Sequence, residues 1–122
     1  MSQVELNKLI DTALNYGDRD AYTKVSVYYF MNGMTESFLF PALVMANKYH
    51  DSSAYFHVYN ILYNWRYDAD FERMDKTTRS IALYYLLKSY ESNYEDAKYD
   101  VEKIFTKKHK SIPKSDAYIL FK

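Results

Sequence analysis

Residues 17–29 read GDRDAYTKVSVYY, and the pattern of this stretch decides the fold because it returns at two later points of the chain. Residues 50–62 read HDSSAYFHVYNIL, and residues 93–105 read NYEDAKYDVEKIF. In each copy the fifth residue is alanine, valine follows four residues later, and large apolar residues follow seven and eight residues later. These positions lie on one face of an α-helix. The pattern therefore predicts three helices, each beginning just after a turn.

A second helix is predicted before each of these three. A small residue lies eight positions ahead of each alanine, and an apolar helical pattern leads up to it; the small residues are Ala13, Ala46 and Ser89. Small residues at matched positions let two helix axes approach closely. We therefore expect about three antiparallel helix pairs, over residues 3–33, 36–65 and 76–108.

The turn inside each pair should fall at Gly17, His50 and Asn93, four residues before the alanine of each copy. A tight turn after a helix often needs a residue at positive φ, which glycine adopts best and Asn and His adopt better than most other residues. Capping or acidic side chains then start the next helix. They are Asp18, Asp51 or Ser52, and Glu95 with Asp96, while Asp75 and Thr77 are candidates ahead of residue 76. Turn positions and core positions thus agree in all three copies.

The three alanines are 33 and then 43 residues apart, a spacing typical of helical solenoid repeats. The ten extra residues fit the stretch 65–74, which we interpret as a long loop between the second and third pairs. Residues 111–122 are interpreted as a short cap over the last pair, with Pro113 at the first position of a helix. The predicted fold is all-α, an α-solenoid of about three helix pairs in a single domain that spans residues 1–122.

The first copy resembles the Sel1-like branch of the tetratricopeptide-repeat superfamily. Gly17 and Ala21 are similar to that family's Gly-x-x-x-Ala opening, and Tyr29 with Asn32-Gly33 resembles its Tyr-x-x-Gly close. The other two copies keep the alanine but lose the glycines, and the likeness covers about residues 3–106. It implies a right-handed solenoid whose first helices line a protein-binding surface. The family includes adaptors and immunity proteins that neutralise a cognate toxin.

The composition limits the class of protein. The chain has 122 residues, 48% of them apolar, so a single domain with a core is expected and disorder is not. Fifteen tyrosines suit a thin two-layer helical stack, because each ring can be buried while its hydroxyl finds a partner. The net charge is zero and cysteine is absent, which excludes disulfides and thiolate metal sites. With no secretory signal and no bilayer-spanning apolar run in the sequence, we expect a cytoplasmic protein without membrane contact.

No residue pattern indicates a reaction. The chain has no Gly-x-Ser-x-Gly or Ser-x-x-Lys motif and no Gly-rich phosphate loop. His50 occupies a turn position, His57 aligns with polar residues in the other copies and is expected to face solvent, and His109 lies among lysines. The acidic residues at 68–75 lack the central glycine of a calcium loop. We therefore predict no enzyme and no catalytic, cofactor or metal site.

Aromatic residues away from the core stripe indicate a binding face. Tyr59 and Tyr63 fall beside the stripe, and tyrosine and tryptophan often carry binding energy at interfaces. In the family resemblance, side chains that flank the core stripe of each first helix would face the partner. The predicted partner-binding residues are Met45, Lys48, Tyr84 and Lys88, joined by Trp65 and Tyr67 from the loop.

The leading hypothesis is a non-enzymatic module that binds another protein, as an adaptor or as an immunity or inhibitor protein. One alternative is a nucleic-acid-binding protein that uses exposed aromatics and a C-terminal lysine cluster. The neutral net charge and the lack of arginine in that cluster make nucleic acid a less favoured partner. A second alternative is a self-associating structural protein, such as a homodimer. The clustered lysines are Lys103, Lys107, Lys108, Lys110 and Lys114.

Overall fold

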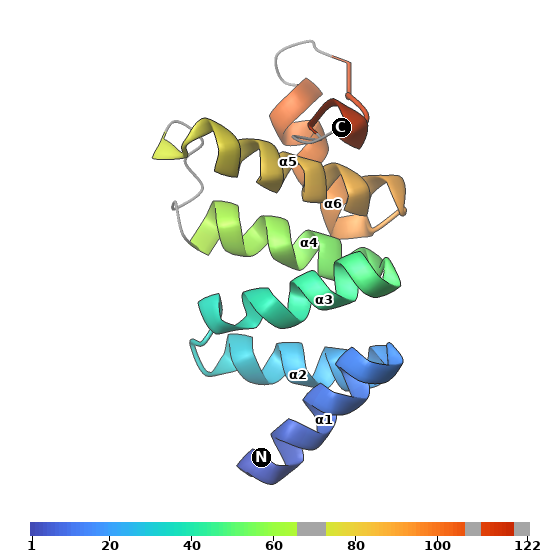
Figure 1. The fold of residues 1–122 in the computed structure, drawn as a ribbon. Helices are drawn as coiled ribbons and strands as arrows, with labels where there is room; N and C mark the ends of the chain where they lie inside the picture. The colour runs from blue at the N-terminus through green and yellow to red at the C-terminus, as the bar shows by residue number, and fades with distance from the viewer. Residues whose placement is uncertain (66–72, 107–110, 119–122) are drawn as a thin grey trace.

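Every regular element in the described part of the chain is a helix, which confirms the all-α prediction. The computed structural model describes residues 1–65, 73–106 and 111–118. The helices follow one another in chain order along the length of the molecule (Figure 1). They are α1 (Gln3–Tyr16), α2 (Arg19–Met31), η1 (Glu36–Phe38), α3 (Leu39–Tyr49), α4 (Ser52–Asn60), η2 (Ile61–Trp65), α5 (Lys76–Glu91), α6 (Glu95–Phe105) and η5 (Ser115–Tyr118).

The three turn positions read from the sequence are confirmed. Gly17, His50 and Asn93 have φ values of 67°, 53° and 63°, the left-handed region that ends a helix sharply. Gly17 and His50 directly follow α1 and α3, and Asn93 lies between α5 and α6. The chain can therefore reverse direction within two or three residues at each of these points.

The predicted N-caps also hold for three helices. The carboxylate of Asp18 accepts from the backbone N–H of Ala21 at 2.9 Å, and that of Asp51 accepts from Ala54 at 2.9 Å. Asp75 caps α5 in the same way, whereas α6 begins without a side-chain cap and carries Glu95 and Asp96 in its first turn. Negative charge at a helix N-terminus complements the helix dipole, so each helix start is locally stabilised.

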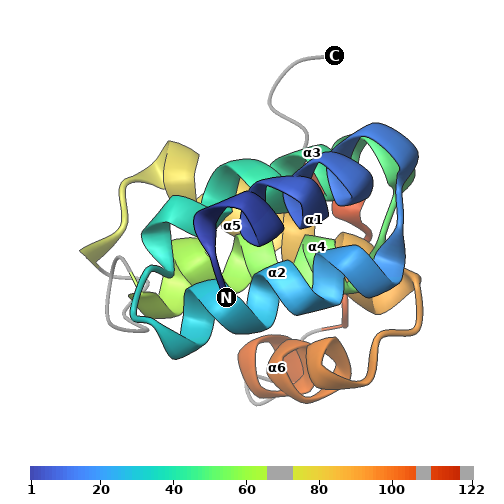
Figure 2. The ribbon, with the colours of Figure 1, turned by 90° about the horizontal axis from the view of Figure 1, so that it is seen from below.

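The helices form two layers. Seen from below, α1, α3 and α5 lie on one side of the molecule and α2, α4 and α6 on the other (Figure 2). Helix α4 packs on α3 and also on α5, and α5 packs in addition on α6 and η5. The small residues Ala46, Ala54, Ser89 and Ala97 at the paired positions are completely buried. Close approach of the helix axes at these residues places the core between the layers.

Hydroxyl groups connect neighbouring helices inside this thin core. Tyr49 on α3 donates to the backbone oxygen of Leu14 on α1 at 2.9 Å. Tyr59 is 0% exposed, and its hydroxyl donates to the carboxylate of Asp100 on α6 at 2.8 Å. The prediction that Tyr59 lies off the core was therefore wrong, because α4 buries the side that faces α6 as well as its core stripe.

The C-terminal segment packs on α5, but its helix begins later than predicted. Pro113 precedes the helix, which is the short 3-10 turn η5 starting at Ser115. Both oxygens of the Glu91 carboxylate accept from Ser115, one from the backbone N–H and one from the hydroxyl, each at 2.8 Å. This anchor fixes the start of the turn at Ser115. No helix within the described ranges is long and apolar enough to cross a bilayer.

Candidate partner-binding face

The structure places three of the predicted partner-binding residues on α3 and α5, which lie in the same layer (Figure 2). Lys48 is exposed in the last turn of α3, and Tyr84 and Lys88 lie one turn apart on α5, both half-buried. Met45 is 0% exposed and belongs to the core. The prediction for Met45 was wrong because α3 lies between neighbours and buries that side as well.

The two predicted loop residues fall outside the described side chains. The backbone of Trp65 ends η2, but its side chain lies outside the described part of the structure, as does the whole of Tyr67. The acidic residues at positions 68, 70 and 72 also lie outside the described ranges, as do Lys107, Lys108 and Lys110 of the lysine cluster. Lys103 and Lys114 are described, and both are exposed.

Tyrosines form the floor between α3 and α5. The hydroxyl of Tyr85 on α5 donates to Oδ1 of Asn47 on α3 at 2.8 Å. The ring of Tyr85 lies 6.1 Å from that of Tyr55 and 5.3 Å from that of Tyr84, the latter edge to face. The hydroxyl of Tyr55 lies 2.9 Å from Nδ1 of His50, whose left-handed backbone places the ring beside the turn. Burial raises the pKa values of Tyr55 and Tyr85, so both phenols stay neutral at pH 7.

Two lysines lie at the edges of this floor. Nζ of Lys88 is 5.7 Å from the ring centre of Tyr55, and Nζ of Lys48 is 5.1 Å from that of Tyr49. An ammonium group at this distance from an aromatic face is attracted to it by about 0.5–1 kcal/mol at exposed sites. We call this surface the α3–α5 face. Its members are Asn47, Lys48, His50, Tyr55, Tyr84, Tyr85 and Lys88.

Four of these members were missed as site residues in reading the sequence. Asn47 and Tyr55 were not singled out, His50 was assigned only to a turn, and Tyr85 was assigned only to the core. Asn47 and Tyr85 are 38 residues apart and meet only once the helices have packed. The available signal was weak: a polar asparagine next to the core position Ala46, in the last turns of a predicted first helix.

The α3–α5 face offers binding chemistry. It presents ammonium groups, phenol rings and hydroxyls, an amide and an imidazole. Its charged groups are cations, and the hydroxyl of Tyr55 lies beside the imidazole of His50. Within the described ranges no group of three or more His, Asp or Glu side chains is arranged to hold a metal ion. The arrangement suits recognition of a polar or anionic surface by aromatic and cationic side chains.

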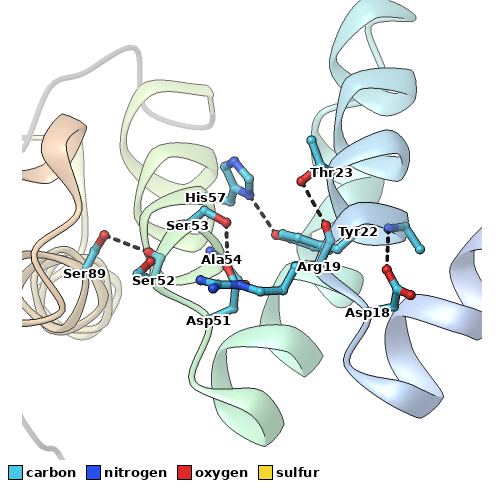
Figure 3. Close-up of polar contacts among 11 residues, drawn as sticks. Asp18, Arg19, Tyr22, Thr23, Asp51, Ser52, Ser53, Ala54, His57 and Ser89 are labelled. Carbon is cyan, nitrogen blue, oxygen red and sulfur yellow. Dashed lines mark hydrogen bonds and ion pairs between the residues drawn. The ribbon is translucent and has the colours of Figure 1, made fainter.

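His57 lies in a second polar cluster, in the layer formed by α2, α4 and α6. It was predicted to face solvent, but it is half-buried instead. It sits at the joint between α2 and α4, where its Nδ1 lies 2.7 Å from the hydroxyl of Tyr22 (Figure 3). The ring centres of Phe30 and Phe38 lie 5.4 and 5.7 Å from the centre of its imidazole ring. Burial lowers the pKa of His57 to about 4, so the ring is neutral at pH 7.

Asp51 also belongs to the polar cluster between α2 and α4. Its carboxylate accepts from the hydroxyl of Ser53, from the backbone N–H of Ala54 and from Nε of Arg19 at 3.0 Å (Figure 3). Burial acts to raise the pKa of Asp51, but the bonds from Ser53, Ala54 and Arg19 outweigh it and hold the pKa below its usual value. Every partner in this cluster is another part of the chain, so we assign it to fold stability.

A shallow hollow of about 440 Å³ opens between α1 and α2, away from these clusters. Its lining mixes opposite charges and includes no residue of the α3–α5 face. The lining residues are Met1, Glu5, Lys8, Leu9, Thr12 and Lys24.

Comparison with known proteins identified no relative of this chain. No family model, no curated protein and no solved structure matches the chain.

Proposed function

We propose that this chain is a non-enzymatic protein-interaction module that binds its partner through the α3–α5 face. The architecture we propose is a right-handed α-solenoid of three antiparallel helix pairs, related to the Sel1-like branch of the tetratricopeptide-repeat superfamily. Support comes from the helix starts and turns, which recur in the same register at Gly17, His50 and Asn93. Solenoids of this kind use the exposed side of one layer as an extended binding surface.

A single observation carries the functional proposal. The half-buried Tyr84 and the two lysines Lys48 and Lys88 all belong to the α3–α5 face. Tyr84 is in contact with the buried Tyr85, so its ring is held in place before a partner arrives. Lys48 and Lys88 each lie over a tyrosine ring, which restricts their long side chains. Side chains ordered in advance lose less conformational entropy on binding, and tyrosine is among the residues that most often dominate interfaces.

Two roles within this class remain open, an adaptor that links other proteins and an immunity or inhibitor protein that covers a toxin or enzyme. Both roles require a stable complex with another protein through a defined face. A surface of about 800 Å² per partner is enough for such a complex, and one layer of a three-pair stack can supply it. The same first experiment therefore applies to both.

The experiment is an affinity pull-down from source-cell lysate with three baits. They are the wild type, the variant Tyr84→Ala/Lys88→Glu, and the matched control Tyr16→Ala/Lys8→Glu on α1. Tyr16 is 82% exposed and Lys8 is exposed, so the control makes the same chemical changes away from the face. We expect the wild type and the control to retain the same protein and the α5 variant to lose it.

Circular dichroism shows first that all three baits are folded. Equal capture by all three would contradict the assignment of the face. Loss in the control alone would move the site to the hollow beside α1. Retention of nucleic acid that washes off with salt would replace the proposal with the nucleic-acid alternative, because phosphate contacts weaken steeply as salt rises.

A further inference from the structure

We propose that the segment bound at the α3–α5 face is acidic, a stretch of a partner protein whose carboxylates meet Lys48 and Lys88. This inference rests on the proposed function and names the chemistry of the partner. Among the described residues no ion pair of either lysine is found, whereas Arg19 pairs with Asp51 and Lys98 pairs with Glu95. The chain as a whole has 16 basic and 16 acidic residues, so it is not generally basic.

The nearby carboxylates are already engaged elsewhere. Glu91 lies three residues after Lys88 on α5, a spacing at which an ion pair is common on a helix. Both of its oxygens instead accept from Ser115 of the C-terminal turn. Asp51, next to the turn residue His50, is directed to Arg19, Ser53 and the N-terminus of α4. The fold thus turns the acidic groups at this end away from Lys48 and Lys88.

The remaining polar groups of the face are donors or neutral. Tyr55 and Tyr85 are neutral phenols at pH 7, and burial raises their pKa values still further. Asn47 uses its amide oxygen to accept from Tyr85, which leaves its NH₂ group to donate to a partner. A carboxylate-bearing segment can therefore meet cations at both edges and a hydrogen-bond donor between them, and it meets no negative charge on the face.

Acidic protein fits these observations better than nucleic acid. A nucleic-acid backbone carries regularly spaced phosphates, and its affinity comes from neutralising many of them. The α3–α5 face offers two lysines and no arginine, on a chain of zero net charge. A short acidic stretch of a protein needs only one carboxylate at each edge and can place apolar side chains against Tyr84.

The test is an NMR titration of the ¹⁵N-labelled full chain with a hexaglutamate peptide. We expect amide shifts confined to residues 47–50 and 84–88. We also expect affinity to fall about tenfold in Lys48→Glu/Lys88→Glu and to be retained in Lys48→Arg/Lys88→Arg. The charge-matched control Lys8→Glu/Lys24→Glu should bind the peptide as the wild type does. Hexalysine should produce no shifts on this face.

Three results would overturn the inference. They are no shift at millimolar hexaglutamate, shifts that the charge reversal leaves unchanged, and tighter binding of oligothymidylate than of hexaglutamate at the same residues. These failures are distinguishable from failure of the proposed function. If the pull-down still depends on Tyr84 and Lys88 while hexaglutamate does not bind, the chain is an interaction module whose partner is not acidic at this face.

Discussion

The hydroxyl of Tyr22 lies 2.7 Å from Nδ1 of His57, and this contact joins α2 to α4 at the joint between the first two helix pairs (Figure 3). Tyr22 is almost completely buried, and burial raises its pKa, so the phenol keeps its proton. His57 is neutral at pH 7 because burial lowers its pKa. The bond between the phenol and Nδ1 therefore joins two neutral groups within an aromatic cluster, and the tautomer of the imidazole sets which of them donates.

Tyr22→Phe should lower the free energy of unfolding by about 1–2 kcal/mol, because it leaves Nδ1 of His57 without its hydrogen-bond partner. Urea unfolding followed by circular dichroism measures the change. Tyr99→Phe is the matched control, since Tyr99 is 69% exposed, and it should alter the stability by less than about 0.5 kcal/mol. Equal effects of the two substitutions would show that the contact contributes nothing to stability.

Stability should fall as pH drops from about 6.5 toward 4. An unfolded histidine has a pKa near 6.5, whereas His57 in the folded chain has a pKa of about 4. Between these values the unfolded chain binds a proton that the folded chain does not, so acid favours unfolding by up to about 3 kcal/mol. The pKa of Asp51 is lowered in the fold, so its contribution is lost at more acidic pH, below the usual aspartate range.

Urea unfolding at a series of pH values measures this profile. His57→Gln removes the titrating ring and should flatten the part of the profile that belongs to His57, between about pH 6.5 and 4. A wild-type profile no steeper than that of the variant would contradict a neutral, buried His57.

Gly17→Ala should destabilise the fold by about 2–4 kcal/mol, which is more than Gly33→Ala should. Both glycines have a φ of +67°, so both substitutions incur left-handed strain of about 1 kcal/mol. At Gly17 a Cβ would also lie 2.5 Å from the ring of Tyr49, whose hydroxyl bonds to α1. At Gly33 a Cβ would meet nothing within 4 Å. Thermal unfolding of the two variants compares them, and equal melting temperatures would contradict the close approach of Tyr49 to the first turn.

Glu91→Ala should release the C-terminal turn from α5. Ser115 loses the acceptor of both its backbone N–H and its hydroxyl, so hydrogen exchange at its amide should accelerate about tenfold or more. Glu95→Ala is the control, because Glu95 pairs only with Lys98 at 3.2 Å among the described contacts. Unchanged exchange at Ser115 in Glu91→Ala would show that the turn is held by its apolar contacts alone.

Local signals in the sequence predicted the helices and their ends well. The turn residues Gly17, His50 and Asn93 and the caps Asp18 and Asp51 act on neighbours within about five residues, so a single sequence contains the whole interaction. The late start of the C-terminal turn could not be read in this way. It depends on a bond between Glu91 and Ser115, which are 24 residues apart.

Burial was predicted less well for the middle helices. A core stripe marks the side of a helix that faces its neighbour in the chain, but α3 also packs on α1, and α4 also packs on α5. Met45, His57 and Tyr59 lie beside the stripe and are buried or half-buried by that second contact. At the end of the stack, α1 buries only Leu6 and Ala13. How closely one pair stacks on the next is set by side chains of both pairs, which the pattern of one repeat does not contain.

Helical periodicity in the sequence predicted part of the α3–α5 face but not the contacts beneath it. Lys48, Tyr84 and Lys88 lie at surface positions that helical periodicity can assign. The floor beneath them depends on Tyr85 reaching Asn47 and on Tyr55 reaching His50 after the helices have packed.

The most direct test of the central claim, that a partner protein binds the α3–α5 face, is hydrogen–deuterium exchange of the chain alone and in complex with the protein retained by the pull-down. We predict slower exchange in the complex at residues 47–50 and 84–88, with α1 and α6 unchanged. Protection confined to α6 and the lysines that follow it, or to α1 and α2, would contradict the claim.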